Sequence, residues 1–153
     1  MVKLIKHEFI YGGHLLSLGA GAIVAAVSLI LDYPFSPILF FVAYLVSQLV
    51  YNFDHLSDVF VDSIHNVERT KHLKSTKNIQ IILFSLYLVL FMWTFLQINT
   101  SLIKLASFIV LGGFAYTLKA KKITKKITGF KNIYIAFFWS VLAFFVPLYF
   151  RSN

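Results

Sequence analysis

Long apolar runs alternate with short polar connections along most of this chain. We expect five membrane-spanning helices, at about residues 12–31, 34–54, 79–98, 102–118 and 133–150. A helix crosses the hydrocarbon core of a bilayer with roughly 20 residues, and these runs are close to that length. The first run is too long for a signal-peptide core and shows no clear cleavage site, so we expect it to be retained. The pattern predicts an all-α integral membrane protein with one domain over residues 1–153.

The composition supports a chain surrounded by lipid. Hydrophobic residues make up 59% of it and charged residues only 13%, whereas charged residues are about 25% of a soluble domain. There is no cysteine, which excludes disulfides, thiolate zinc sites and cysteine nucleophiles. We interpret the net charge of +8 as basic loops facing anionic lipid head groups, and we expect no nucleic-acid partner.

The positive charges fall into only some of the connections. The short connections at residues 32–36 and 99–101 carry none. The amino-terminal segment and the connections 55–78 and 119–132 hold all the Lys and Arg residues except Lys104 and Arg151. Because positive residues stay on the cytoplasmic side of a membrane, we expect the amino terminus and both basic loops to be cytoplasmic. The expected location is a prokaryotic plasma membrane, crossed several times.

Carboxylates at helical spacing follow the second apolar run. Asp54, Asp58 and Asp62 are four residues apart, and Asn66 continues the series. Residues at this spacing share one face of a helix, where like charges repel, and Asp is a poor helix former. The series therefore lowers helix stability unless a ligand compensates. A solvated helix face at the membrane edge is the simpler alternative.

A hard divalent cation is the natural ligand for these carboxylates. Mg²⁺ prefers oxygen ligands and is usually held by one or two carboxylates together with substrate phosphates. The aspartate series suits Mg²⁺ that bridges to a diphosphate. Lysines of the loop 119–132 lie on the same side of the membrane, and we select Lys121 and Lys122 as candidates to bind the same anion. Membrane topology and lipid contact also explain these lysines.

At these residues the chain resembles the UbiA-type membrane prenyltransferase superfamily. The series from Asp54 to Asn66, with Arg69 after it, is similar to the first acidic motif of that family. Asp54 stands where the family usually has Asn, and Val67 stands where Pro is common. The run 116–132 resembles the tyrosine, basic cluster, glycine and asparagine that precede the fifth helix of the family.

The resemblance implies a fold and a reaction. The fold is a helical bundle of which this chain resembles the first half. Mg²⁺ bound by two acidic motifs holds a prenyl diphosphate, the diphosphate leaves, and a lipophilic acceptor captures the allylic cation. Carried over to this sequence, the metal ligands are Asp54, Asp58 and Asp62, and the diphosphate-binding residues are Asn66, Arg69, Lys121 and Lys122.

One part of the family pattern is not in this sequence. The second acidic motif should follow a sixth span, but the only acidic residue after Asp62 is Glu68. We therefore leave catalysis by the lone chain open. The chain is expected to be a truncated enzyme, a half that needs a second half-chain or a second copy, or a descendant that binds without catalysing. The alternative function is a non-catalytic multi-pass membrane protein that binds isoprenoid lipid or acts as an assembly subunit.

Overall fold

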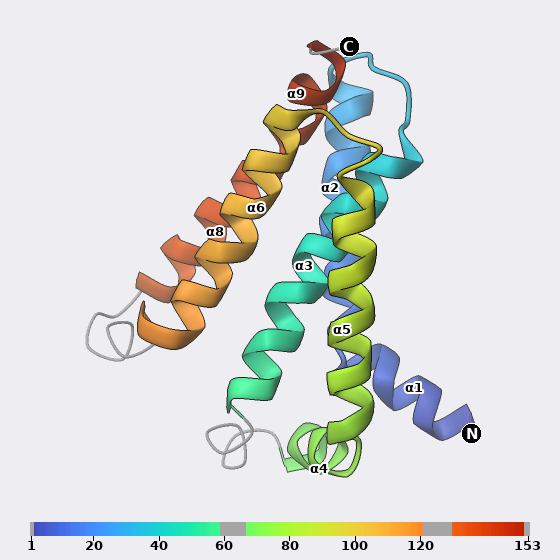
Figure 1. Ribbon diagram of the computed structural model, residues 1–153, viewed down its shortest axis with the longest axis vertical. Coiled ribbons are helices and arrows are strands. Elements are labelled where there is room, and N and C mark those ends of the chain that lie inside the picture. Colours follow the sequence, from blue (N-terminus) through green and yellow to red (C-terminus); the bar gives the residue numbers. More distant parts are fainter. Residues whose placement is uncertain (1, 59–66, 121–129, 152–153) are drawn as a thin grey trace.

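A computed structural model describes residues 2–58, 67–120 and 130–151, and every regular element in these ranges is a helix (Figure 1). The helices are α1 (Val2–Tyr11), α2 (His14–Ile30), α3 (Pro37–Asp58), α4 (Val67–Ser75), α5 (Lys77–Thr94), α6 (Thr100–Ala115), the π-helix η1 (Tyr116–Ala120), α8 (Phe130–Leu142) and α9 (Phe145–Arg151). The predicted all-helical class is confirmed.

Four helical stretches are long and apolar enough to cross a membrane, which supports an integral membrane protein. They are Pro37–Ser57, Lys77–Thr94, Thr100–Lys119 and Asn132–Arg151. The expected span at residues 12–31 corresponds to α2, a shorter apolar helix of 17 residues. At about 1.5 Å per residue such a helix reaches about 25 Å, slightly less than the hydrocarbon thickness of a typical bilayer.

Two glycines explain why the first apolar segment is shorter than expected. Gly12 and Gly13 separate α1 from α2, and Gly13 has a left-handed φ of 82°. A Cβ atom at Gly13 would also lie 3.2 Å from Cβ of Tyr51 on α3. Glycine therefore allows both the change of direction and the close approach to α3.

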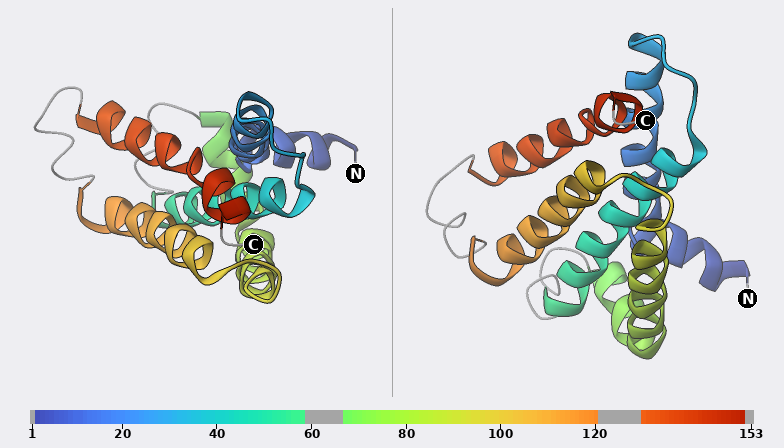
Figure 2. Two further views of the ribbon diagram at one scale, coloured as in Figure 1. Left: turned by 90° about the horizontal axis from the view of Figure 1, so that it is seen from above. Right: turned by 45° about the horizontal axis from the view of Figure 1, so that its top comes forward.

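Helix α3 is the centre of the bundle. It packs against α2, α5 and α6, and the side chains of Leu39, Val42, Ala43, Leu45 and Leu49 are fully buried. Figure 2 shows α6 and α8 running side by side as a second layer that diverges from α3 toward one end. The last expected span consists of α8 and α9, which together provide one apolar stretch.

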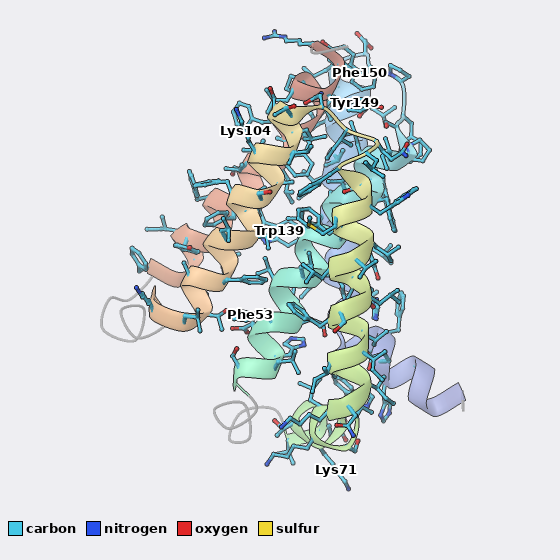
Figure 3. All side chains as sticks on the ribbon, viewed as in Figure 1. Phe53, Lys71, Lys104, Trp139, Tyr149 and Phe150 are labelled. Carbon is cyan, nitrogen blue, oxygen red and sulfur yellow. The ribbon has the colours of Figure 1, made fainter. Side chains whose placement is uncertain are left out.

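The two ends of the bundle differ in charge. Helices α1 and α4, η1 and the C-terminal end of α3 all lie toward the lower end in Figure 1, with α1 and η1 on opposite sides. We call this the basic end. Figure 3 shows Lys71 at this end and Lys104 near the other. That this end faces the cytoplasm stays a prediction from the positive charges.

Candidate functional site

The carboxylate series begins on the membrane helix itself. Helix α3 continues to Asp58, four residues beyond the boundary expected at residue 54. Asp54 and Asp58 therefore have the predicted helical spacing. The rest of the predicted site lies outside the described part of the structure: this holds for the side chains of Asp58 and Arg69 and for Asp62, Asn66, Lys121 and Lys122.

Asp54 is half-buried between α3 and the end of α6. The hydroxyl of Thr117, a buried residue of η1, donates a hydrogen bond to Oδ1 of Asp54 over 3.1 Å. Short π-helical segments inside α-helices are frequent at functional sites. Asp54 belongs to the predicted acidic motif, and Thr117 belongs to the run 116–132. The structure therefore places the beginnings of the two sequence features beside each other.

Close packing of α3 on α6 holds this contact. Gly113 faces Val50, and a Cβ atom at Gly113 would lie 2.5 Å from Cγ1 of Val50 and closer still to Cγ2. Glycine is needed for the two backbones to come this close. The rings of Phe53 and Phe114 lie 4.2 Å apart between their centroids, and the ring of Phe84 from α5 is 6.3 Å from each. An aromatic cluster is thus formed by Phe53, which precedes Asp54 on α3, and by phenylalanines of α5 and α6.

A second polar site is centred on Glu8 of α1. Its Oε2 atom accepts hydrogen bonds from Nε2 of Gln80 over 2.7 Å and from Nε2 of His72 over 2.9 Å. Nε2 of His14 lies 3.8 Å from the other carboxylate oxygen. We call these four residues the Glu8 cluster. Burial alone would raise the pKa of Glu8, but its contacts with His14, His72 and Gln80 prevail and lower it.

Polar contacts continue from the Glu8 cluster into the bundle. Nδ1 of His14 lies 2.5 Å from the hydroxyl of Tyr44. The fully buried Gln48 accepts a hydrogen bond from Ser17 over 2.6 Å and donates one to the carbonyl of Gly12 over 2.8 Å. These bonds join α2 to α3 at the basic end.

Asn52 lies one turn beyond Gln48 on α3 and is also fully buried. Within the described residues, neither polar atom of its side-chain amide has a hydrogen-bond partner, and Oε1 of Gln80 has none. We call Gln48, Asn52 and Gln80 the polar interior. Buried amides are normally paired with protein groups or with ordered water, so these groups could bond to a polar molecule that enters the region.

Sequence reasoning did not select the Glu8 cluster or the polar interior. Two signals were present. Glu8 is the only acidic residue among the first 31 residues, and Gln48 and Asn52 are amides at helical spacing inside an apolar run. Polar side chains on one face of a membrane helix commonly face the bundle interior and mark function. His55, which sequence position alone places at the interface, is buried.

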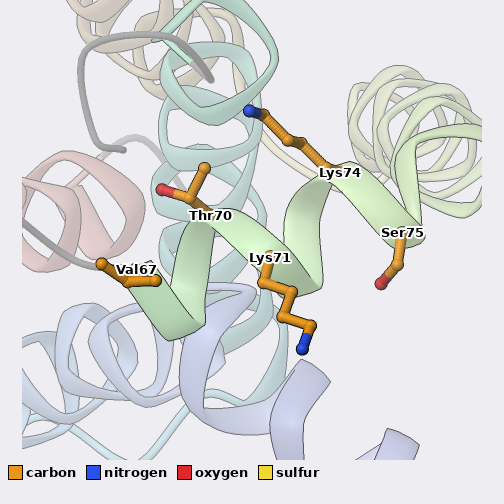
Figure 4. A pocket seen from close by; sticks show the side chains of 5 residues that line it. All are labelled: Val67, Thr70, Lys71, Lys74 and Ser75. Carbon is orange, nitrogen blue, oxygen red and sulfur yellow. The ribbon is translucent and has the colours of Figure 1, made fainter. Parts of the chain in front are cut away.

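An open, shallow pocket of about 550 Å³ lies along α4. In Figure 4, Thr70 and Lys74 project toward the same side of α4. Thr70 is buried, and its hydroxyl has no hydrogen-bond partner in the ranges that the structure describes. The lining residues are Val67, Thr70, Lys71, Lys74 and Ser75. The two lysines make this part of the basic end favourable for an anion.

Among the residues with described positions, no group of three or more His, Asp or Glu side chains is arranged to hold a metal ion. That finding does not extend to the aspartate series, of which only the Asp54 side chain is described. Its carboxylate is of the oxygen-donor type that Mg²⁺ prefers.

Comparison of the chain with protein-family models, curated proteins and solved structures finds no match. The relation to membrane prenyltransferases is therefore a prediction from the sequence motifs.

Proposed function

We propose that the basic end of the bundle binds a prenyl diphosphate together with Mg²⁺, and that the chain is a UbiA-like prenyltransferase or the amino-terminal half of one. The observation that supports this most directly is the hydrogen bond from Thr117 to Asp54. It brings together the first residue of the acidic series and the run of residues that leads into the basic loop.

The charges at the basic end suit a diphosphate. Asp54 and Asp58 on α3 repel each other, and a divalent cation bound there removes that repulsion. Lys71, Lys74 and Lys119 belong to helices at the same end and provide positive charge for the phosphate oxygens. The reaction we propose replaces the bond between the allylic carbon and the diphosphate oxygen with a bond to a lipophilic acceptor.

The aromatic cluster suits the prenyl chain. Phe53, Phe84 and Phe114 come from three different helices, and Phe53 directly precedes Asp54 on α3. Aromatic faces stabilise a nearby cation through their quadrupole, and their area is favourable for an isoprenoid chain. A diphosphate at the carboxylates would place the first prenyl unit next to these rings.

The proposal is tested by measuring the affinity of the detergent-solubilised protein for a non-hydrolysable prenyl diphosphate analogue, with Mg²⁺ and with a chelator. We expect binding to require Mg²⁺ and to weaken at least about tenfold in Asp54→Asn and in Asp58→Asn, which corresponds to about 1.4 kcal/mol for each. Asp32→Asn is the matched control, because Asp32 lies beyond the other end of α2. Unchanged affinity in both motif variants, or an equal loss in Asp32→Asn, refutes the site.

A second candidate is a non-catalytic membrane protein that binds isoprenoid lipid or acts as an assembly subunit. It is favoured by the single acidic series, since the family reaction uses two. Incubation of the pure chain with a prenyl diphosphate and lipid extracts distinguishes the two. Prenylated product supports the enzyme, whereas co-purified isoprenoid without turnover supports the binding protein. Chemical crosslinking in lipid then tests whether a second copy of the chain completes the site.

A further inference from the structure

Helices α1 and α4 lie at the basic end and are not among the helices long enough to span a membrane. They contact each other, and each also contacts the bundle, α1 through α2 and α4 through α5. Helix α1 is joined to α2 by Gly12 and Gly13, and α4 is joined to α5 at Thr76. Each helix is therefore joined to the bundle by a short connection.

One carboxylate holds these two helices against the bundle. Glu8 of α1 accepts hydrogen bonds from His72 of α4 and from Gln80 of α5, and it faces His14 of α2. Hydrogen bonds to an ionised acceptor are about twice as strong as neutral ones. A single side chain therefore connects four helices, and its loss affects all of these contacts together.

A second contact between the two helices is exposed to solvent. The hydroxyl of Tyr11 on α1 donates a hydrogen bond to Oε2 of Glu68 on α4 over 2.9 Å. Exposed polar contacts contribute little because water competes for both groups. The two carboxylates of this region therefore provide a natural comparison, since Glu8 is mostly buried and Glu68 is exposed.

The polar interior lies behind these contacts. The amide of Gln48 is bonded to the carbonyl of Gly12, at the junction between α1 and α2. Asn52 is one turn nearer the basic end on the same face of α3, and Gln80 is bonded to Glu8 itself. Glu8 and the junction between α1 and α2 are therefore bonded directly to two residues of the polar interior, Gln80 and Gln48.

We propose that α1 and α4 form a lid over the polar interior and that Glu8 is the latch that holds the lid closed. Opening gives a hydrogen-bonding head group access to the amide of Asn52, which can both donate and accept. The lid does not depend on the proposed diphosphate site. Asp54 contacts η1, whereas Gln48 on the other side of α3 contacts α2.

Cysteine accessibility tests the lid directly, because the chain has no natural cysteine. Asn52→Cys places a thiol at a fully buried position behind the lid. The rate of its reaction with a water-soluble maleimide is measured in detergent or lipid discs. We expect slow labelling with Glu8 present and at least a tenfold faster rate after Glu8→Ala. Glu8→Gln keeps one acceptor oxygen and should give a smaller increase.

Two controls separate a lid from general loosening. Ala43→Cys is fully buried on the same helix, nearer the opposite end, and its labelling rate should not change when Glu8 is replaced. Glu68→Gln should change the labelling of Asn52→Cys by less than twofold. The proposal is overturned by an unchanged rate in Glu8→Ala, by equal acceleration at both cysteines, or by an effect of Glu68→Gln as large as that of Glu8→Ala.

Discussion

The close approach of α6 to α3 should fail when Gly113 acquires a side chain. In Gly113→Ala the new Cβ atom meets both methyl groups of Val50, at 2.5 Å from one and closer to the other, while Cβ of Val50 is 3.0 Å away. Overpacking of this kind destabilises by about 1–3 kcal/mol. The better helix propensity of alanine offsets up to about 1 kcal/mol of that loss.

Gly19→Ala is the matched control for this substitution. It makes the same change on α2, where the added Cβ would be 3.8 Å from Cη2 of Trp139, an ordinary contact distance. The difference between the two variants therefore isolates the clash at about 1–3 kcal/mol. Thermal unfolding followed by circular dichroism should place Gly113→Ala below Gly19→Ala by about 2–4 °C for each kcal/mol.

Val50→Ala should then compensate. The substitution removes the two methyl groups that the new Cβ meets, at a cost of about 0.8 kcal/mol for each buried carbon on its own. In the Gly113→Ala background we expect it to be neutral or stabilising, which gives a coupling energy of about 1 kcal/mol or more in a double-mutant cycle. Additive losses, or equal stability of Gly113→Ala and Gly19→Ala, would show that α3 and α6 are not in close contact at this position.

Three further predictions concern the polar groups at the basic end. Because hydrogen bonds lower the pKa of Glu8 below its ordinary value of 4.5, its stabilising effect should be complete at pH values above about 4.5 and disappear as acid protonates it. His14 and His72 face it from α2 and α4, and a pH titration of unfolding should show a loss of stability in acid that Glu8→Gln reduces. Thr117→Val removes the donor to Asp54, and it should lower stability by about 1 kcal/mol and weaken Mg²⁺-dependent binding of the analogue in the same affinity assay. Asn52→Leu replaces an unpartnered buried amide by an apolar group, and it should raise the free energy of unfolding by about 1–3 kcal/mol. A loss of stability in Asn52→Leu would show that the amide is satisfied in the folded protein.

Hydropathy and spacing predicted the membrane helices and the beginning of the aspartate series. Long apolar runs have few alternatives in a bilayer, where backbone groups must be paired within a helix. The spacing of Asp54 and Asp58 is a local property of one helix, so it also follows from sequence. The length of α2 was overestimated, because hydropathy does not distinguish an apolar helix from the left-handed turn that Gly13 makes before it.

The Glu8 cluster is a property of the tertiary structure. His72 and Gln80 are separated from Glu8 by more than 60 residues, and nothing in the local pattern around any of them indicates the others. The aromatic cluster has the same character, since Phe53, Phe84 and Phe114 come together only when three helices pack. Composition showed that phenylalanine is abundant, with 17 residues, but abundance does not select three of them.

Helix α3 connects the two polar regions and allows their coupling to be measured. Asn52 and Asp54 are two residues apart, which is about 200° around a helix, so they face opposite sides of α3. A ligand on one side can influence the other only by moving α3 or the helices at its end.

If the diphosphate analogue stabilises the closed lid, it must slow the labelling of Asn52→Cys at saturation. Because coupling is reciprocal, Glu8→Ala must then weaken binding of the analogue. The loss of affinity equals the factor by which the bound analogue reduces lid opening. We expect this factor to be small, at most about fivefold, because no described contact connects Glu8 to Thr117 or Asp54. A larger reciprocal effect would show that the lid and the carboxylates form a single site.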